Sequence, residues 1–251
     1  MTGKTLKWVV LIAVLVLPFL IYYIFVYSAE ENFFVTLEYV GPKEEVELIE
    51  DGDTVVKTRY YQVPYWEYTT QDDTLLSSRE MRGNIMLVNF FFTSCPSICP
   101  AMNYNVQQVL DRFKNYENFK VVSFTVDPEH DTVEVLKAYE KRIGGIPGKW
   151  YFLTGDQQEI YQTAADHFLS AMEDEAAEGG FLHSQNLVLV DWNGHIRSGK
   201  DEQGNLIGVY DGLSPTAIKE LKSDIKVLIA DYEKTKSVNE YREEKKKKEN
   251  E

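Results

Sequence analysis

The segment from Ile85 to Phe92 limits the possible folds most strongly. Its sequence, IMLVNFFF, is almost continuously apolar. A strand of this kind is apolar on both faces, so both faces have to be covered, as in the sheets of α/β proteins. Lys120–Val126 is a second run of the same type. Two such strands predict an α/β fold in which helices cover a central sheet.

Segments with helical periodicity lie between the predicted strands. Pro100 suits the first turn of a helix, and apolar residues follow it at helical spacing. Asp131 is expected to cap the next helix, with Glu134 completing a capping box. The rest of the pattern predicts, in order, a strand at 150–153, a helix at 156–169, a strand at 186–190, a strand near 195–198 and a helix from 214 to about Tyr232. This order predicts a mixed sheet with helices on both faces.

Residues 8–27 contain no charge and would rise about 30 Å as a helix, enough to cross a bilayer. The run is longer than the apolar region of a signal peptide and lacks a small-x-small cleavage site, so it predicts a retained anchor. Lys4 and Lys7 place residues 1–7 in the cytoplasm by the positive-inside rule. No Arg- and Ser-rich transit segment precedes the run. The expected location is the bacterial inner membrane, crossed once, with the soluble part in the periplasm.

The remaining chain divides by composition. Residues 28–62 are the predicted lead-in. Within it, residues 33–59 alternate polar and apolar side chains around turn signals, which predicts an extended segment with a hairpin. Residues 63–232 form the predicted main domain. Residues 171–180 are acidic and end in two glycines, which indicates a mobile loop. The tail, 233–251, is rich in Lys and Glu, and it is expected to be solvated or frayed.

The charge balance argues against nucleic acid as a partner. The chain has 26 Lys and Arg residues against 40 Asp and Glu residues, a formal net charge of −14. A surface of this sign repels phosphate backbones. The sequence also lacks a Gly-rich phosphate loop, a Gly-x-Ser-x-Gly elbow and a His-Glu-x-x-His motif, so nucleotide hydrolysis, ester hydrolysis and zinc proteolysis have no support.

The chain has two cysteines, Cys95 and Cys99, and both lie where the first predicted strand leads into a helix. The positive end of the helix dipole stabilises a thiolate, so the pKa of both thiols is expected to be low. A spacing of four is expected to put the side chains one turn apart on one helical face. Two adjacent sulfurs could then hold one metal ion or oxidise to a disulfide.

Three motifs resemble those of the SCO/SenC family of copper-binding proteins. They are CPSICP at 95–100, VDPEHD at 126–131, and LHS at 182–184 just before a hydrophobic strand. The resemblance covers roughly residues 63–232. It implies a thioredoxin-like fold, a role in assembling the copper site of cytochrome c oxidase, and His183 as a metal ligand. Ser97 departs from the pattern, since many relatives carry an acidic residue there.

The chemistry of the ligands agrees with that implication. Copper(I) favours thiolates, and an imidazole can complete a site that also accepts copper(II). Cys95, Cys99 and His183 are therefore expected to bind one copper ion. Zinc is the competing metal, but structural zinc usually needs four protein ligands. Asp127 is a candidate hydrogen-bond acceptor beside the cysteines, although Asp before Pro is also ordinary turn chemistry.

Three classes of function use such a scaffold: a copper metallochaperone, a thiol:disulfide oxidoreductase and a thiol peroxidase. Thioredoxin-type oxidoreductases usually space their cysteines by two residues and carry a proline facing the dithiol. Here three residues separate the cysteines, and no proline occurs between Pro147 and Pro215. A peroxidase would need an arginine clamp, which nothing near Cys95 suggests. These features favour a metallochaperone, whose partner would be the copper-site subunit of cytochrome c oxidase or another envelope cuproprotein. An oxidoreductase that reduces client cysteines stays open as the alternative.

Overall fold

A computed structural model describes residues 7–8, 11, 14–23, 36–50, 53–173 and 181–249. The chain forms two units, Met1–Thr36 and Leu37–Glu251. In the first unit residues 14–23 are helical. Among the residues that the structure describes, no helix has both the length and the apolar character needed to span a membrane. The predicted anchor at 8–27 lies partly outside the described residues, so it stays a prediction.

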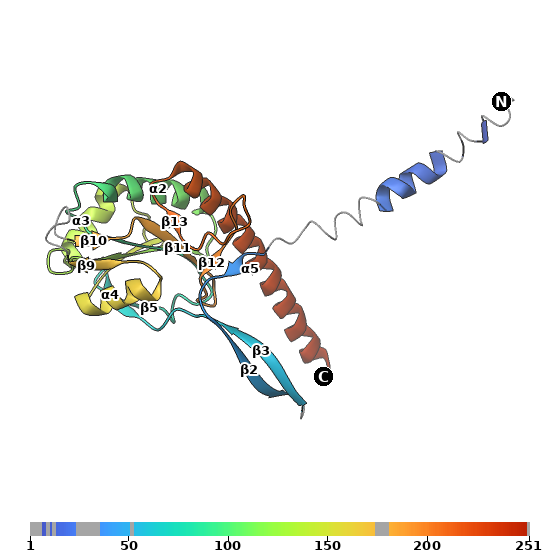
Figure 1. The fold of residues 1–251 in the computed structure, drawn as a ribbon, viewed down its shortest axis with the longest axis horizontal. Coiled ribbons are helices and arrows are strands. Elements are labelled where there is room, and N and C mark those ends of the chain that lie inside the picture. The colour runs from blue at the N-terminus through green and yellow to red at the C-terminus, as the bar shows by residue number, and fades with distance from the viewer. Residues whose placement is uncertain are drawn as a thin grey trace. The chain divides into compact units, whose positions relative to one another are not determined.

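The second unit is built on a seven-stranded sheet (Figure 1). The central strands β6, β7 and β8 are parallel to one another, and the outer strands join antiparallel to their neighbours. The mixed sheet predicted from the sequence is therefore confirmed. In spatial order its strands are β13 (Tyr210–Asp211), β11 (Asn186–Val190), β6 (Ile85–Phe91), β7 (Phe119–Thr125), β8 (Trp150–Thr154), β4 (Glu67–Thr70) and β5 (Leu75–Ser77).

Helices cover both faces of this sheet. They are α2 (Ile98–Phe113), α3 (Val133–Ile143), α4 (Gln157–Asp166) and α5 (Pro215–Glu249). Neighbouring side chains of a strand point to opposite faces. The Phe90 ring lies against His167 at the end of α4, whereas the Phe91 ring lies against Tyr139 of α3. Helices α3 and α4 therefore cover opposite faces, as predicted.

All residues of β6 are buried. Because neither face of the strand meets solvent, its sequence does not alternate between polar and apolar residues. Phe90, Phe91 and Phe92 are at most 1% exposed. Burial of each such side chain contributes about 1.5–3 kcal/mol relative to exposure. The loop that carries the cysteines leaves directly from this rigid strand.

Three small two-stranded sheets complete the second unit. They are β1 (Glu38–Tyr39) with β12 (Arg197–Ser198), β2 (Lys43–Glu50) with β3 (Asp53–Tyr60), and β9 (Ala171–Glu173) with β10 (Phe181–His183). The β2–β3 pair confirms the hairpin predicted in the lead-in. Arg197 fixes the start of this unit, because its guanidinium pairs with Asp191 at 3.0 Å and donates to the backbone oxygen of Leu37 at 2.7 Å.

Three local predictions were wrong. Helix α5 continues past Tyr232 to Glu249, since Lys and Glu are good helix formers that need no apolar partner. Residues Ala171–Glu173 form a strand, not a loop, because they pair with β10; residues 174–180 lie outside the described part of the chain. Thr132, not Asp131, is the N-cap residue of α3, because the Asp131 side chain is engaged elsewhere.

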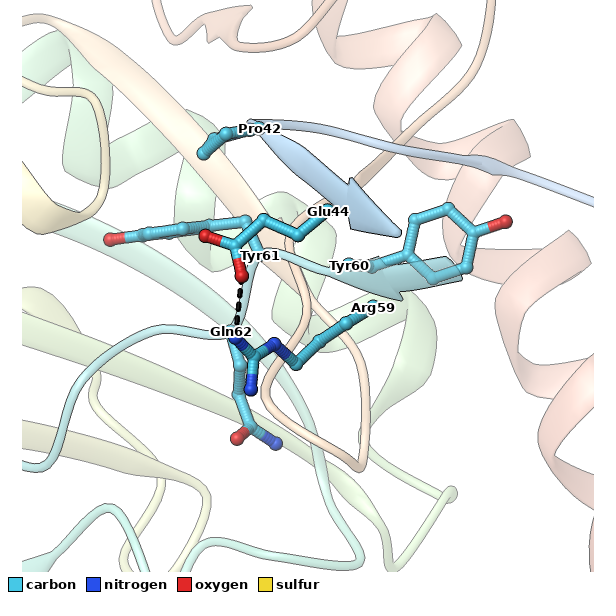
Figure 2. A pocket seen from close by; sticks show the side chains of 6 residues that line it. All are labelled: Pro42, Glu44, Arg59, Tyr60, Tyr61 and Gln62. Carbon is cyan, nitrogen blue, oxygen red and sulfur yellow. Dashed lines mark hydrogen bonds and ion pairs between the residues drawn. The ribbon is translucent and has the colours of Figure 1, made fainter. Parts of the chain in front are cut away.

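A hollow of about 230 Å³ lies at the base of the β2–β3 hairpin (Figure 2). An ion pair between Arg59 and Glu44, 2.5 Å long, lies in its lining. The lining residues are Pro42, Glu44, Arg59, Tyr60, Tyr61 and Gln62. None of them is a cysteine or a histidine, so this hollow lacks the soft ligands of the cysteine loop.

Candidate metal centre

The cysteines lie where β6 leads into α2, Cys95 on the connecting turn and Cys99 at the start of the helix. The backbone N–H of Cys95 donates to the oxygen of Phe92 at 3.3 Å, which folds the chain back after the strand. Helix α2 begins only at Ile98, so Cys99 is in its first turn and Cys95 precedes it. The prediction that both cysteines share one helical face is wrong. Their sulfurs meet because the turn brings Cys95 back over the start of the helix.

His183 joins the two cysteines from the far end of β10. Its Nε2 atom lies 3.2 Å from the Cys99 sulfur and 4.0 Å from the Cys95 sulfur. The three ligand atoms all lie within 4.8 Å of one another. Cys95, Cys99 and His183 are 8%, 1% and 9% exposed. The structure thus brings together the three residues that the sequence analysis grouped, with His183 at the end of strand β10.

Two contacts hold the imidazole in place. The ring of Phe92 packs edge-on against it, with centroids 5.5 Å apart and planes at 88°. The Nδ1 atom of His183 lies 3.3 Å from the backbone oxygen of Ser184. A proton on Nδ1 that donates to this oxygen leaves the Nε2 lone pair facing the sulfurs, which is the tautomer that ligates a metal.

The two thiols have opposite pKa shifts. A hydrogen bond from the Cys99 thiol lowers the pKa of Cys95, and hydrogen bonds from the backbone N–H groups of Cys99 and Ser97 add to this effect against burial. The proton donated to Cys95, together with burial, raises the pKa of Cys99. The prediction that both thiols have a low pKa is therefore wrong for Cys99. The lowered pKa of Cys95 favours its thiolate, which is the form that binds a metal or attacks a disulfide.

The spacing of the ligands suits one metal ion. Metal–sulfur and metal–nitrogen bonds of about 2.3 and 2.0 Å in a trigonal plane separate the ligand atoms by about 3.7–4.0 Å. The sulfur–nitrogen distances of 3.2 and 4.0 Å bracket this range, so small side-chain movements suffice. Two thiolates and one imidazole form a soft ligand set.

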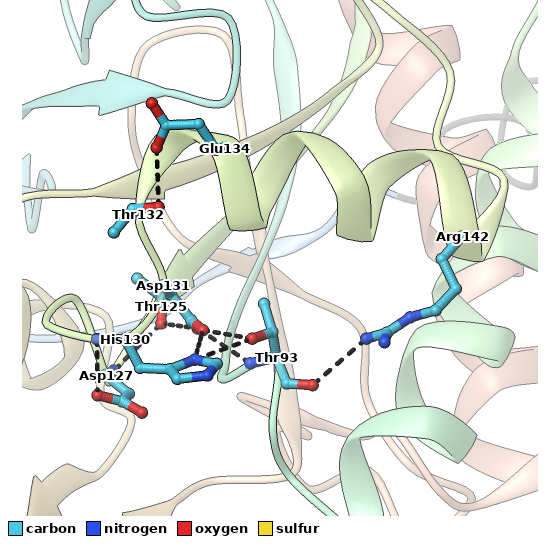
Figure 3. Close-up of polar contacts among 8 residues, drawn as sticks. All are labelled: Thr93, Thr125, Asp127, His130, Asp131, Thr132, Glu134 and Arg142. Atoms are coloured by element: carbon cyan, nitrogen blue, oxygen red, sulfur yellow. Dashed lines mark hydrogen bonds and ion pairs between the residues drawn. The ribbon is translucent and has the colours of Figure 1, made fainter.

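Asp127 lies in the turn after β7, where its backbone N–H donates to Thr125 and its carboxylate accepts from the N–H of His130. Its ligand atom groups with those of His130 and Asp131, not with the cysteines. The carboxylate that reaches the cysteine loop is that of Asp131, which accepts the N–H of Thr93 at 2.9 Å (Figure 3). Sequence reasoning missed this contact, because the position of Asp131 before a helix suggested a cap.

Fold and site together define a thioredoxin-like protein with a Cys–Cys–His centre. A family model for SCO1/SenC matches residues 57–214. The SCO1 protein homolog of Bacillus subtilis is 30% identical over 178 residues, which cover 70% of this chain and 86% of that protein. The chain belongs to the SCO1/SenC family.

Solved structures agree with this assignment. BsSco, described as a member of the Sco family of cytochrome c oxidase assembly proteins with a disulfide switch, is 27% identical with a TM-score of 0.56. The match covers 67% of this chain and 93% of BsSco. ScoI of Bradyrhizobium japonicum with copper bound is 22% identical with a TM-score of 0.50, over 64% of this chain and 98% of that one. At 22% identity, the second match shows that the two proteins share a fold.

Proposed function

We propose that this protein is a copper metallochaperone that carries one copper ion on Cys95, Cys99 and His183. Its client would be the copper-site subunit of cytochrome c oxidase or another envelope cuproprotein. The observation that carries the proposal is the convergence of two buried sulfurs and one imidazole nitrogen within 4.8 Å. The relatives support it, since one was solved with copper bound and another is described as an oxidase assembly protein.

Copper fits this ligand set better than zinc. Among the residues that the structure describes, this group has three members, and structural zinc sites almost always use four protein ligands. Copper(I) accepts two thiolates readily, and the imidazole adds a ligand that copper(II) also accepts. A site with only three protein ligands suits a carrier, because the client's ligands can replace those of the carrier one at a time.

The proposal includes a membrane anchor at residues 8–27, with the cysteine-bearing unit in the periplasm of a bacterium. Its support is the uncharged run itself and the lysines at positions 4 and 7 before it. An anchor would confine the carrier to the membrane surface on which a membrane-bound client presents its copper site.

Thiol labelling of spheroplasts tests this topology. The native cysteines are buried, so they are replaced by serine and one new cysteine is placed at exposed Glu202. A membrane-impermeant maleimide should label Glu202→Cys in intact spheroplasts. The matched variant, Thr2→Cys in the same background, should be labelled only after lysis. The opposite pattern would overturn the proposed orientation.

Deletion of the gene tests the copper proposal. Oxidase activity should fall, and added copper should restore part of it, because mass action can load the client without a carrier. Complementation with the wild-type chain should restore activity at low copper, whereas complementation with Cys95→Ser should not. The chaperone proposal would be contradicted if an external thiol reductant restored the oxidase activity of the deletion strain and copper did not restore it at any concentration.

One observation favours a second candidate, a thiol:disulfide oxidoreductase that reduces client cysteines. The pKa of Cys95 is lowered and that of Cys99 is raised, which favours a thiolate on Cys95 beside the thiol of Cys99, and a dithiol attacks a client disulfide from such a state. Holding copper(I) requires the same reduced pair. The response to reductant in the deletion strain distinguishes this candidate from the first.

A further inference from the structure

A buried carboxylate lies beneath the cysteine loop (Figure 3). The Asp131 side chain is fully buried, and both of its oxygens accept hydrogen bonds. Oδ2 accepts from the Thr93 backbone at 2.9 Å and from the Thr125 hydroxyl at 2.5 Å. Oδ1 accepts from the Thr93 hydroxyl and lies 2.9 Å from Nδ1 of His130. Together these hydrogen bonds compensate for the cost of removing the Asp131 carboxylate from water.

These bonds lie beyond the end of the sheet. The ladder between β6 and β7 ends at the pair Phe91 and Thr125, and one further bond runs from Val126 N–H to the Phe91 oxygen. The strand ends are therefore fixed without Asp131. Its contacts with Thr93 extend the fixed region two residues into the cysteine loop.

Every polar atom of Thr93 is engaged. Its N–H and hydroxyl donate to Asp131, and its backbone oxygen accepts from Arg142 Nη2 of α3 at 3.4 Å. Thr93 follows Phe92, whose ring packs against His183, and precedes Cys95 by two residues. Movement of Thr93 would therefore displace the support of the imidazole and one of the sulfurs together.

We propose that Thr93, held by the buried Asp131 carboxylate, is a positioning residue that presets the Cys95–Cys99–His183 geometry for a metal ion. The inference rests on the proposed copper function. A centre whose supporting residues are fixed loses less conformational entropy when it binds its ligand. Without the two Thr93–Asp131 bonds the loop samples open positions, so metal affinity falls and the buried Cys99 sulfur is exposed more often.

The test compares Thr93→Val with Thr93→Ser and Thr125→Val in the full-length chain. Affinity for copper(I) is measured by competition with a chromophoric chelator. Alkylation of Cys99 by iodoacetamide is followed by mass spectrometry on the reduced, metal-free protein. Thr93→Val should lower the affinity about tenfold and accelerate alkylation by a similar factor, because a hydrogen bond to a charged group is lost. Thr93→Ser keeps the hydroxyl and should behave as the wild type.

Thr125→Val is the matched control, since it removes a hydroxyl bond to the same carboxylate, and with it the bond accepted from the Asp127 N–H, but leaves both bonds to Thr93. It should lower the free energy of unfolding about as much as Thr93→Val, with copper affinity and alkylation near the wild-type values. Equal changes in the two valine variants, or no rescue by Thr93→Ser, would overturn the positioning role. If the wild type binds no copper, the proposed function fails and the alkylation comparison alone decides whether Thr93 positions the loop.

Discussion

Replacing Cys95 and Cys99 together by serine should abolish tight copper(I) binding. A serine hydroxyl is a hard ligand that stays protonated at neutral pH, whereas copper(I) prefers thiolates. Structural metal sites with four ligands release about 10–16 kcal/mol on binding, or roughly 3 kcal/mol for each ligand. Each lost thiolate should therefore lower the affinity about a hundredfold or more. Equilibrium dialysis should give one copper ion per wild-type chain and none per double variant.

His183→Ala separates the roles of the ligands. It leaves both sulfurs, so copper(I) should remain bound, while the copper(II) form should weaken most because it depends on the imidazole. His195→Ala is the matched control, because His195 Nδ1 contacts the backbone oxygen of Tyr61 and not the cysteines. Its copper content should equal that of the wild type. Unchanged copper stoichiometry in the double serine variant would exclude this site.

Much of the fold could be predicted because each signal was local. The run Ile85–Phe92 became β6 and its extension, since a strand covered on both faces has a nearly continuous apolar sequence. The periodicity from Met102 to Phe113 marked the buried face of α2. The end of α5 was misjudged because helical propensity continues past Tyr232 without any apolar periodicity. Apolar patterns locate packed surfaces, and they do not mark the end of an exposed helix.

The centre was predictable only in part, since its members are remote in sequence. Cys99 and His183 are 84 residues apart, and it was the resemblance to a known family that linked them. The helix dipole predicted a low pKa for both thiols. The hydrogen bond to Cys95, together with burial, raises the pKa of Cys99 against that effect, and this bond depends on a geometry that spacing alone does not specify. The bonds between Asp131 and Thr93 were missed because they join two segments that are 38 residues apart, beyond the ends of the strands.

Acid should destabilise the fold through His167. This side chain is fully buried; Nδ1 donates to the Thr163 oxygen at 2.7 Å, and Nε2 has no hydrogen-bond partner among the described residues. Burial beside the rings of Phe90 and Phe124 lowers its pKa from 6.5 to about 4. The unfolded chain therefore binds a proton at a higher pH than the folded chain, so stability is full above pH 6.5 and falls as the pH drops toward 4.

The shift of roughly 2.5 pKa units corresponds to a loss of about 3 kcal/mol in the free energy of unfolding across this window. Urea denaturation at pH 7 and at pH 4 measures the loss. His167→Leu removes the titrating group, so its stability should change by about 3 kcal/mol less than that of the wild type between the two pH values. It should also be less stable at pH 7, because the bond to Thr163 is lost. His195→Gln, which removes a histidine elsewhere, should keep the acid sensitivity. A leucine side chain cannot be protonated. If His167→Leu nevertheless lost as much stability in acid as the wild type, the acid sensitivity would have to come from other groups.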